Sequence, residues 1–394
     1  RSAMRRLSAQ YIITASGKTL RKAVITTGDD GTILEISGEN GSGTEIHSVE
    51  FYNGIIVPGF INCHCHLELS HLKGMIEERT GLPEFIMKIR SERSLNESRA
   101  ITAMSRSDSE MYSEGVVMCA DICNSSASFG MKGKSRIRYL NLLEVFGIDP
   151  GRAEKRIQEI TALASEAERQ ALKYSIVPHS PYSVSVPLFR KLRELTTENR
   201  VTSIHFMESG YETGFLSNND GPLRDSYELS GILPEILATP QSHEETIMEL
   251  VSPAGNLILV HNTFAESSVV RTIIKRENTF WCLCPGSNMY ITGIMPPVGM
   301  LRDEGCEIVL GTDSPASNRM LSILYEMKLI QEHFPDTGLE ELISWGTLNG
   351  ARALWAEDEL GSIEPGKNPG LLLLEGADLK SFKLLPGTTV KRLV

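Results

Sequence analysis

Short apolar runs separated by polar turns mark both ends of the chain. Before residue 57 these runs are divided by Gly-Lys and Asp-Asp-Gly turns, a pattern typical of short β-strands; they are 11–14, 23–26 and 32–36. After about residue 357 the same pattern returns, with Gly and Pro turns around the apolar run 371–374. We therefore predict that the two ends of the chain form one small β domain.

The middle of the chain alternates strand-like apolar runs with longer helical patterns. Helical periodicity is clear in 151–172, 187–199 and 266–277. The alternation repeats eight times, which predicts a parallel (β/α)8 barrel of the TIM type; the strands are expected at 55–64, 116–123, 138–147, 173–180, 202–208, 257–262, 279–285 and 307–314. The fold class is thus α/β, with a barrel over 55–356 and a composite β-sandwich from 1–54 and 357–394.

Composition and charge exclude several classes of protein. The chain has 394 residues, 41% of them hydrophobic, and a net charge of −11 with no long basic run, so we expect no nucleic-acid or membrane partner. No apolar segment approaches the roughly 20 residues of a membrane span. The first 20 residues lack the apolar run of a secretory signal, and the seven cysteines lie mostly in apolar runs. We therefore expect a cytoplasmic protein with reduced thiols.

The first barrel strand ends in a His-x-His triplet. Successive side chains of a strand point to opposite faces, so His64 and His66 share one face. Two imidazoles on one face can bind one metal ion. Such a triplet also occurs by chance, so the other strand ends decide whether this one is functional.

Five predicted strands end in residues that can bind a metal or move a proton. In a barrel the chemistry lies at the C-terminal ends of the strands. A single histidine at a strand end is usually a satisfied polar group, but five such ends together indicate a metal site; the residues are His64, His66, His179, His205, Glu208, His261 and Asp313. His71 lies just beyond the first strand end. The other three histidines are expected at the surface, in turn or helix settings; they are His47, His243 and His333.

These residues suggest one reaction centre. Three histidines and one aspartate suit a single Zn²⁺ or Fe²⁺ with an open position for water, whose pKa the metal lowers toward neutrality; the predicted ligands are His64, His66, His205 and Asp313. Glu208 lies three residues beyond His205, close enough to carry a proton from the water to a leaving nitrogen. Asp313 would also accept a hydrogen bond from the water, and His261 would orient the water or polarise the attacked centre.

Several motifs, spread over nearly the whole chain, match one enzyme superfamily. They are 57–66, 179–185, 205–208, 260–262, 284–288, 311–318 and 360–367. With them the chain resembles the amidohydrolase superfamily, in its branch of cytosine-deaminase-like and chlorohydrolase-like enzymes.

The resemblance implies the same roles for the strand-end residues. The His-x-His pair, the strand-5 histidine and the strand-8 aspartate bind the metal in that superfamily, the glutamate shuttles protons, and the strand-6 histidine assists. Members with two metals carry a carboxylated lysine at the end of strand 4, where this chain has Val177-Pro178-His179. The resemblance thus implies one divalent metal, with Zn²⁺ expected and Fe²⁺ as the alternative. Its members are commonly dimers or larger, so a homodimer is one expectation.

Further resemblances suggest substrate contacts. The segment His179-Ser-Pro-Tyr182 resembles one with which purine-nucleoside deaminases touch substrate, and 66–70 is similar to aminofutalosine deaminases, which remove ammonia from an adenine ring. The candidate substrate-binding residues are His179, Glu68, His71, Ser287 and Asn288. The long connection 208–255 is predicted to be a lid at the barrel mouth.

We therefore expect a hydrolase acting on carbon–nitrogen bonds other than peptide bonds. The first hypothesis is hydrolytic deamination of an amino-heterocycle, an amino-purine or a related nucleoside. A second is hydrolysis of a cyclic amide or imidazolone C–N bond, or a chlorohydrolase-type reaction. A third is a barrel that binds a ligand without turnover. The metal site is common to the first two hypotheses, so only the product separates them.

Overall fold

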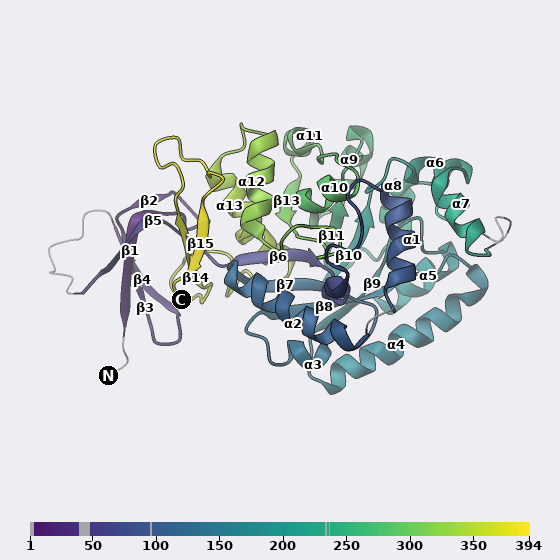
Figure 1. The fold of residues 1–394 in the computed structure, drawn as a ribbon, viewed down its shortest axis with the longest axis horizontal. Coiled ribbons are helices and arrows are strands. Elements are labelled where there is room, and N and C mark those ends of the chain that lie inside the picture. The colour runs from purple at the N-terminus through teal and green to yellow at the C-terminus, as the bar shows by residue number, and fades with distance from the viewer. Residues whose placement is uncertain (1–3, 39–47, 95–96, 233–234, 236) are drawn as a thin grey trace.

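The molecule has two parts, a sheet that carries both chain ends and a larger α/β part. The computed structural model describes residues 4–38, 48–94, 97–232, 235 and 237–394. Figure 1 shows the sheet with both termini on one side and the helices and strands of the α/β part on the other. His47, expected at the surface, lies outside the described residues.

Seven strands from both ends of the chain form the terminal sheet. Its order is β15-β14-β5-β1-β3-β4, with β2 paired to β1. Strands β1 and β5 are parallel, and the other pairs are antiparallel. The strands are β1 (Arg5–Ile12), β2 (Leu20–Arg21), β3 (Val24–Thr27), β4 (Ile33–Ser37), β5 (Glu50–Pro58), β14 (Leu371–Glu375) and β15 (Thr389–Arg392). The pairing places the two chain ends in one sheet, and the predicted sandwich arrangement stays a prediction.

The predicted strand 55–64 is two strands in the structure. Strand β5 ends at Pro58 and pairs with β14, whereas β6 (Phe60–Cys65) begins after Gly59 and pairs with β7 of the α/β part. A Cβ atom at Gly59 would lie 2.3 Å from Val117 Cγ1 and 2.5 Å from the Pro369 carbonyl oxygen. The apolar run is continuous in sequence, so its division between two sheets is seen only in the strand pairing.

The α/β part contains eight strands in two parallel sheets. Their orders are β6-β7-β8-β9 and β10-β11-β12-β13. Backbone hydrogen bonds also link the sheets at both edges, from His205 N to His179 O (2.9 Å) and from Thr312 N to His64 O (3.0 Å). The strands after β6 are β7 (Val116–Cys123), β8 (Arg138–Val145), β9 (Tyr174–Pro178), β10 (Val201–Phe206), β11 (Asn256–His261), β12 (Thr279–Leu283) and β13 (Glu307–Leu310). The predicted parallel α/β arrangement is confirmed.

Helices connect these strands and cover them. Strand β11 is buried along its whole length, with Leu257 and Leu259 in one hydrophobic cluster and Ile258 and Val260 in another, as expected for a parallel strand covered on both faces. The helices are α1 (Leu82–Glu92), α2 (Glu97–Ser113), α3 (Phe129–Lys132), α4 (Ala153–Arg169), α5 (Val186–Leu195), α6 (Glu212–Asn218), α7 (Pro222–Leu229), α8 (His243–Glu245), α9 (Ser267–Ile273), α10 (Pro285–Ile291), α11 (Val298–Asp303), α12 (Ile323–His333), α13 (Leu339–Gly346) and α14 (Leu348–Ala353).

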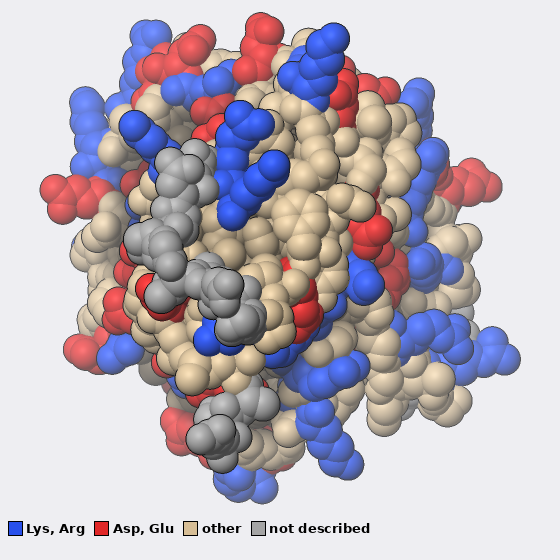
Figure 2. All heavy atoms as spheres, turned by 90° about the vertical axis from the view of Figure 1, so that its left-hand side faces the viewer, with Lys and Arg blue, Asp and Glu red and all other residues tan. Residues whose placement is uncertain are grey.

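The surface shows charges of both signs. On the end of the molecule that carries the terminal sheet, Lys and Arg side chains are interspersed with Asp and Glu (Figure 2). All seven cysteines are free thiols, and six of them are buried. Within the described part of the chain, no helix is both long and apolar enough to span a bilayer.

One arginine connects the terminal sheet to the α/β part. Arg392 of β15 donates from Nη2 to the carbonyl oxygens of Tyr112 (2.8 Å) and Val116 (3.0 Å), and its guanidinium lies 3.9 Å from the Tyr112 ring centroid. We expect Arg392→Ala to lower the free energy of unfolding by about 1–3 kcal/mol, because two hydrogen bonds and a cation–π contact are lost. Thermal denaturation measures this, with the exposed neighbour Lys391→Ala as control. Equal melting temperatures for both variants would contradict the prediction.

Candidate metal and catalytic site

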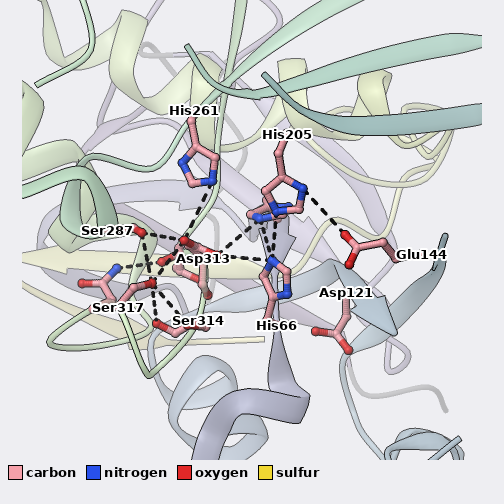
Figure 3. Close-up of polar contacts among 12 residues, drawn as sticks. His66, Asp121, Glu144, His205, His261, Ser287, Asp313, Ser314 and Ser317 are labelled. Atoms are coloured by element: carbon pink, nitrogen blue, oxygen red, sulfur yellow. Dashed lines mark hydrogen bonds and ion pairs between the residues drawn. The ribbon is translucent and has the colours of Figure 1, made fainter. Parts of the chain in front are cut away.

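Strand ends from both parallel sheets converge on one cluster of imidazoles and carboxylates. Figure 3 shows the side chains pointing toward one another from these ends. His261 and Asp313 have backbone φ angles of +87° and +56°, in the left-handed region that costs non-glycine residues of order 1–3 kcal/mol. Such strain persists where the surrounding structure fixes the backbone. The converging residues are His64, His66, His205, Glu208, His261 and Asp313.

The four predicted metal ligands lie together, and we call them the metal cluster. His66 Nε2 lies 3.1 Å from His64 Nε2 and 3.2 Å from His205 Nε2. Asp313 Oδ1 lies 3.4 Å from the Nε2 atoms of His64 and His66. His64 is fully buried, and His205 and Asp313 are nearly so.

The chemistry of the metal cluster fits a divalent cation. His205 Nδ1 donates to the His179 carbonyl oxygen at 2.8 Å, which leaves Nε2 as a bare lone pair facing the cluster. Burial lowers the pKa of His64 to about 4 and that of His66 to about 3, so both imidazoles are in the neutral form that binds metals. One N–H at His66 Nε2 cannot donate a hydrogen bond to both His64 Nε2 and His205 Nε2, whereas one cation can accept a lone pair from each of the three nitrogens. Imidazole and carboxylate ligands suit Zn²⁺ and Fe²⁺ alike.

Glu208 and His261 face the same side of the metal cluster. His261 Nε2 lies 3.5 Å from Glu208 Oε1 and 3.9 Å from Asp313 Oδ2, and it has no hydrogen-bond partner among the described residues. Burial raises the pKa of Glu208 well above its usual range, and the charges of Asp313 and Glu212 raise it further. Glu208 is therefore suited to hold a proton next to the place where a reacting atom would lie.

Ser287 and Asn288 form hydrogen bonds with the side chains of Asp313 and His261. Asn288 Oδ1 accepts a hydrogen bond from His261 Nδ1 (3.1 Å), and Asn288 Nδ2 donates to Thr263 Oγ1 (2.7 Å), which fixes the orientation of the amide. Ser287 Oγ donates to Asp313 Oδ2 at 2.5 Å. Both residues are buried, and neither lines the pocket described next. These contacts favour a role for Ser287 and Asn288 in orienting Asp313 and His261, and not in direct contact with substrate.

A pocket of about 160 Å³ opens onto the metal cluster, and we call it the site pocket. Its lining combines His66, His179, His205, Glu208, His261 and Asp313 with apolar side chains of α1 such as Phe85 and Ile89. Tyr182 and Tyr227 also line it, and the Tyr227 hydroxyl donates to the Tyr182 carbonyl oxygen at 2.7 Å. An apolar pocket with titratable groups at one end suits a flat heteroaromatic molecule.

Glu68 and His71 lie in a neighbouring cavity of about 1330 Å³, the outer groove, and do not line the site pocket. The Glu68 carboxylate accepts hydrogen bonds from Arg93 Nη2 (2.7 Å) and from the backbone N–H groups of Asn124 (3.0 Å) and Ser125 (2.9 Å). His71 Nε2 lies 3.0 Å from the Arg93 carbonyl oxygen. Both side chains therefore hold Arg93 and the 124–125 backbone in place.

His243 is buried, so the prediction that it lies at the surface is wrong. It is 3% exposed, and its Nε2 lies 2.9 Å from Glu212 Oε2. Glu212 Oε1 in turn accepts from the backbone N–H of Glu208 at 3.2 Å. Both residues belong to the 208–255 connection, which carries α6, α7 and α8. Their pairing could not be inferred from the sequence because both lie on helices of this connection and not at strand ends. His333, by contrast, is exposed as predicted.

Glu144, the penultimate residue of β8, was not predicted as a site residue. Glu144, His179 and His205 each offer one possible ligand atom, and these three atoms lie within 4.8 Å of one another. Glu144 lines both the site pocket and the outer groove. The available signal was a single carboxylate within the apolar run 138–147, at a predicted strand end.

Curated relatives are nucleoside deaminases. The chain is 26% identical over 321 residues to a 5-methylthioadenosine/S-adenosylhomocysteine deaminase of Thermococcus kodakarensis, covering 76% of this chain and 69% of the relative. It is 25% identical over 342 residues to an adenosine deaminase of Helicobacter pylori, covering 82% of this chain and 79% of the relative.

Solved structures with the same fold include deaminases and a chlorohydrolase. The aminofutalosine deaminase of Helicobacter pylori superposes with a TM-score of 0.82 at 21% identity, covering both chains fully. A zinc-bound adenosine deaminase from Xanthomonas campestris has a TM-score of 0.70 at 19% identity, covering 95% of this chain and 85% of its own. A zinc-bound atrazine chlorohydrolase from Arthrobacter aurescens has a TM-score of 0.74 at 16% identity, covering 95% and 88%. At these identities the likeness establishes the fold.

The family assignment rests on most of the chain. Residues 55–393 match the sequence model of the amidohydrolase family, a range that contains every converging residue of the site. The superfamily resemblance inferred from the strand-end motifs is thereby confirmed. The chain belongs to the amidohydrolase family.

Proposed function

We propose that this protein is a metal-dependent hydrolase that deaminates an amino-purine or a related nucleoside. The observation that carries the proposal is the buried carboxyl group of Glu208, beside His261 and Asp313, where an apolar pocket meets the metal cluster. A deaminase needs a group that holds a proton and releases it to a departing nitrogen. The nucleoside deaminase relatives support the choice of substrate class.

The proposed ligands of the cation are the four residues of the metal cluster, His64, His66, His205 and Asp313. Zn²⁺ is the expected metal and Fe²⁺ the alternative, since the donor set suits both. When bound, the cation supplies Lewis acidity that makes water an effective nucleophile near neutral pH.

Glu208 is proposed to move the proton in both halves of the reaction. It takes a proton from the attacking water as the water oxygen bonds to the amine-bearing ring carbon. It then delivers that proton to the amine nitrogen as the C–N bond breaks, and ammonia leaves. The second proton of the water moves from its oxygen to the adjacent ring nitrogen, so that a ring carbonyl remains. His261, held through Nδ1 by Asn288, points Nε2 at the reacting atoms, and Asp313 Oδ2 is held by Ser287. His179 lines the pocket and is proposed to contact the ring.

Finer features of the fold are also proposals. The hydrogen bonds at both sheet edges support a single closed barrel of eight strands. The proposed domains remain 55–356 for the barrel and 1–54 with 357–394 for the small composite domain, although β5 continues to Pro58 across the first boundary. A cytoplasmic location and a homodimer stay predictions.

Ammonia release tests the proposed function directly. We expect zinc-loaded protein to release ammonia from at least one adenine nucleoside, in a panel that also contains adenine, cytosine, pterins and cyclic amides. The product should be the matching 6-oxo nucleoside, identified by mass spectrometry. Ring opening of a cyclic amide with no ammonia from any amine would favour the alternative hydrolase reaction and reject deamination.

A further inference from the structure

One buried carboxylate oxygen in the site pocket lacks a partner. The side chain of Glu144, at the end of β8, is 4% exposed. Its Oε1 accepts a hydrogen bond from Asn124 Nδ2 at 3.0 Å, whereas Oε2 has no hydrogen-bond partner among the described residues. An unpaired buried carboxylate oxygen is unfavourable, so a donor from outside the chain is expected to meet it.

The neighbouring side chains do not satisfy this oxygen. His205 Nδ1 lies 3.6 Å from Oε2, and that nitrogen already donates to the His179 carbonyl oxygen at 2.8 Å. Arg93 Nη2 donates to Glu68 (2.7 Å) and to Asn124 Oδ1 (3.0 Å). Glu144 Oε2 is therefore a buried acceptor without a donor among the described residues, on a side chain that lines the site pocket.

Glu144 lies away from the reacting end of the pocket. Figure 3 shows it on the side of His205 opposite Asp313 and His261. His205 Nδ1 faces Glu144, whereas Nε2 faces the metal cluster. Glu208 groups with His261 and Asp313, and Glu144 groups with His179 and His205. A substrate whose amine-bearing carbon lies beside Glu208 therefore presents its remote part to Glu144.

The remote part of a purine nucleoside is its sugar. The amine is on the six-membered ring and the sugar is on the five-membered ring, so the two occupy opposite ends of the molecule. Sugar hydroxyls are O–H donors, and their hydrogen bonds to an ionised carboxylate oxygen are short and charge-assisted. Glu144 also lines the outer groove, which gives a substituent on the sugar room to extend.

We propose that Glu144 Oε2 binds a 2′- or 3′-hydroxyl of a nucleoside substrate. This assignment rests on the proposed function and narrows it, because it selects ribonucleosides over free bases and over sugars without hydroxyls. Glu144 acts on binding and orientation, and the proton transfer stays with Glu208.

The test compares adenosine with 2′,3′-dideoxyadenosine as substrates of zinc-loaded protein. We expect the wild type to prefer adenosine by about 10- to 100-fold in kcat/KM. Glu144→Met, which keeps the length of the side chain without an acceptor, should bring this ratio close to one, mainly by losing activity on adenosine. Glu144→Gln, which keeps an acceptor without the charge, should give an intermediate ratio. Glu159→Met, at a carboxylate of the outer groove wall, should leave the ratio unchanged.

The outcomes separate this inference from the proposed function. A purely structural role of Glu144 would lower kcat/KM for both substrates equally, so an unchanged ratio in the Gln and Met variants would overturn the inference. Calorimetry with the 6-oxo products, inosine and 2′,3′-dideoxyinosine, gives a second readout, in which only the wild type should prefer inosine. A wild type that is active on adenosine but does not prefer it to 2′,3′-dideoxyadenosine would reject the role assigned to Glu144 and leave the proposed function intact. A wild type inactive on every adenine nucleoside would reject the proposed function and this inference with it.

Discussion

Replacing Glu208 with glutamine is expected to lower kcat by about 10³-fold or more while leaving the bound metal in place. The amide keeps the size of the side chain but cannot take a proton from water or return it to the leaving nitrogen. Because the metal cluster uses other residues, its donors are unchanged. The measurement combines the rate of ammonia release with the metal content of the purified variant.

The control for this experiment is a carboxylate outside the pocket. Glu228→Gln, on α7, removes a largely exposed charge that pairs with Arg224 and should retain wild-type turnover. Loss of metal together with activity in Glu208→Gln would show a structural role instead. Retained activity would reject Glu208 as the proton carrier and direct attention to His261, whose Nε2 is 3.5 Å away.

Removing one imidazole of the metal cluster is expected to abolish both metal binding and activity. In His205→Ala the cluster loses the nitrogen that lies 3.2 Å from His66 Nε2, and three donors remain. We expect about one zinc per chain in the wild type and little in the variant. Because a bound ion stabilises only the folded state, zinc should raise the melting temperature of the wild type and not that of His205→Ala.

His333→Ala is the matched control, since His333 is an exposed histidine on α12. It should bind zinc and keep activity as the wild type does. Stoichiometric zinc in His205→Ala, with the same thermal shift as the wild type, would contradict the proposed ligand set. The metal would then be held by a different group of residues, and the role of Asp313 would need the same test.

The sequence by itself predicted the parallel strands of this protein and the residues that converge at their ends. Alternation of apolar strands with helical patterns predicted the parallel α/β arrangement, because strands buried on both faces are continuously hydrophobic. The two-residue period of a strand placed His64 and His66 on one face, and their Nε2 atoms lie 3.1 Å apart. Residues at the ends of parallel strands meet at one edge of the sheet, so the six converging residues could be identified without coordinates.

Only the tertiary structure decided how other polar residues are used. Glu68 and His71 follow the first strand closely in sequence, yet they hold Arg93 in the outer groove. Ser287 and Asn288 brace Asp313 and His261 from outside the pocket, and His243 is buried against Glu212.

The physical reason is the range of the interactions involved. Strand periodicity and strand ends are local properties, so the sequence reports them directly. Whether a polar side chain in a loop faces substrate or another side chain depends on contacts between segments far apart in the chain. The unpartnered oxygen of Glu144 is such a case, because none of the described residues around it donates a hydrogen bond to it. Pairings of that kind exist only once the strands and loops are assembled.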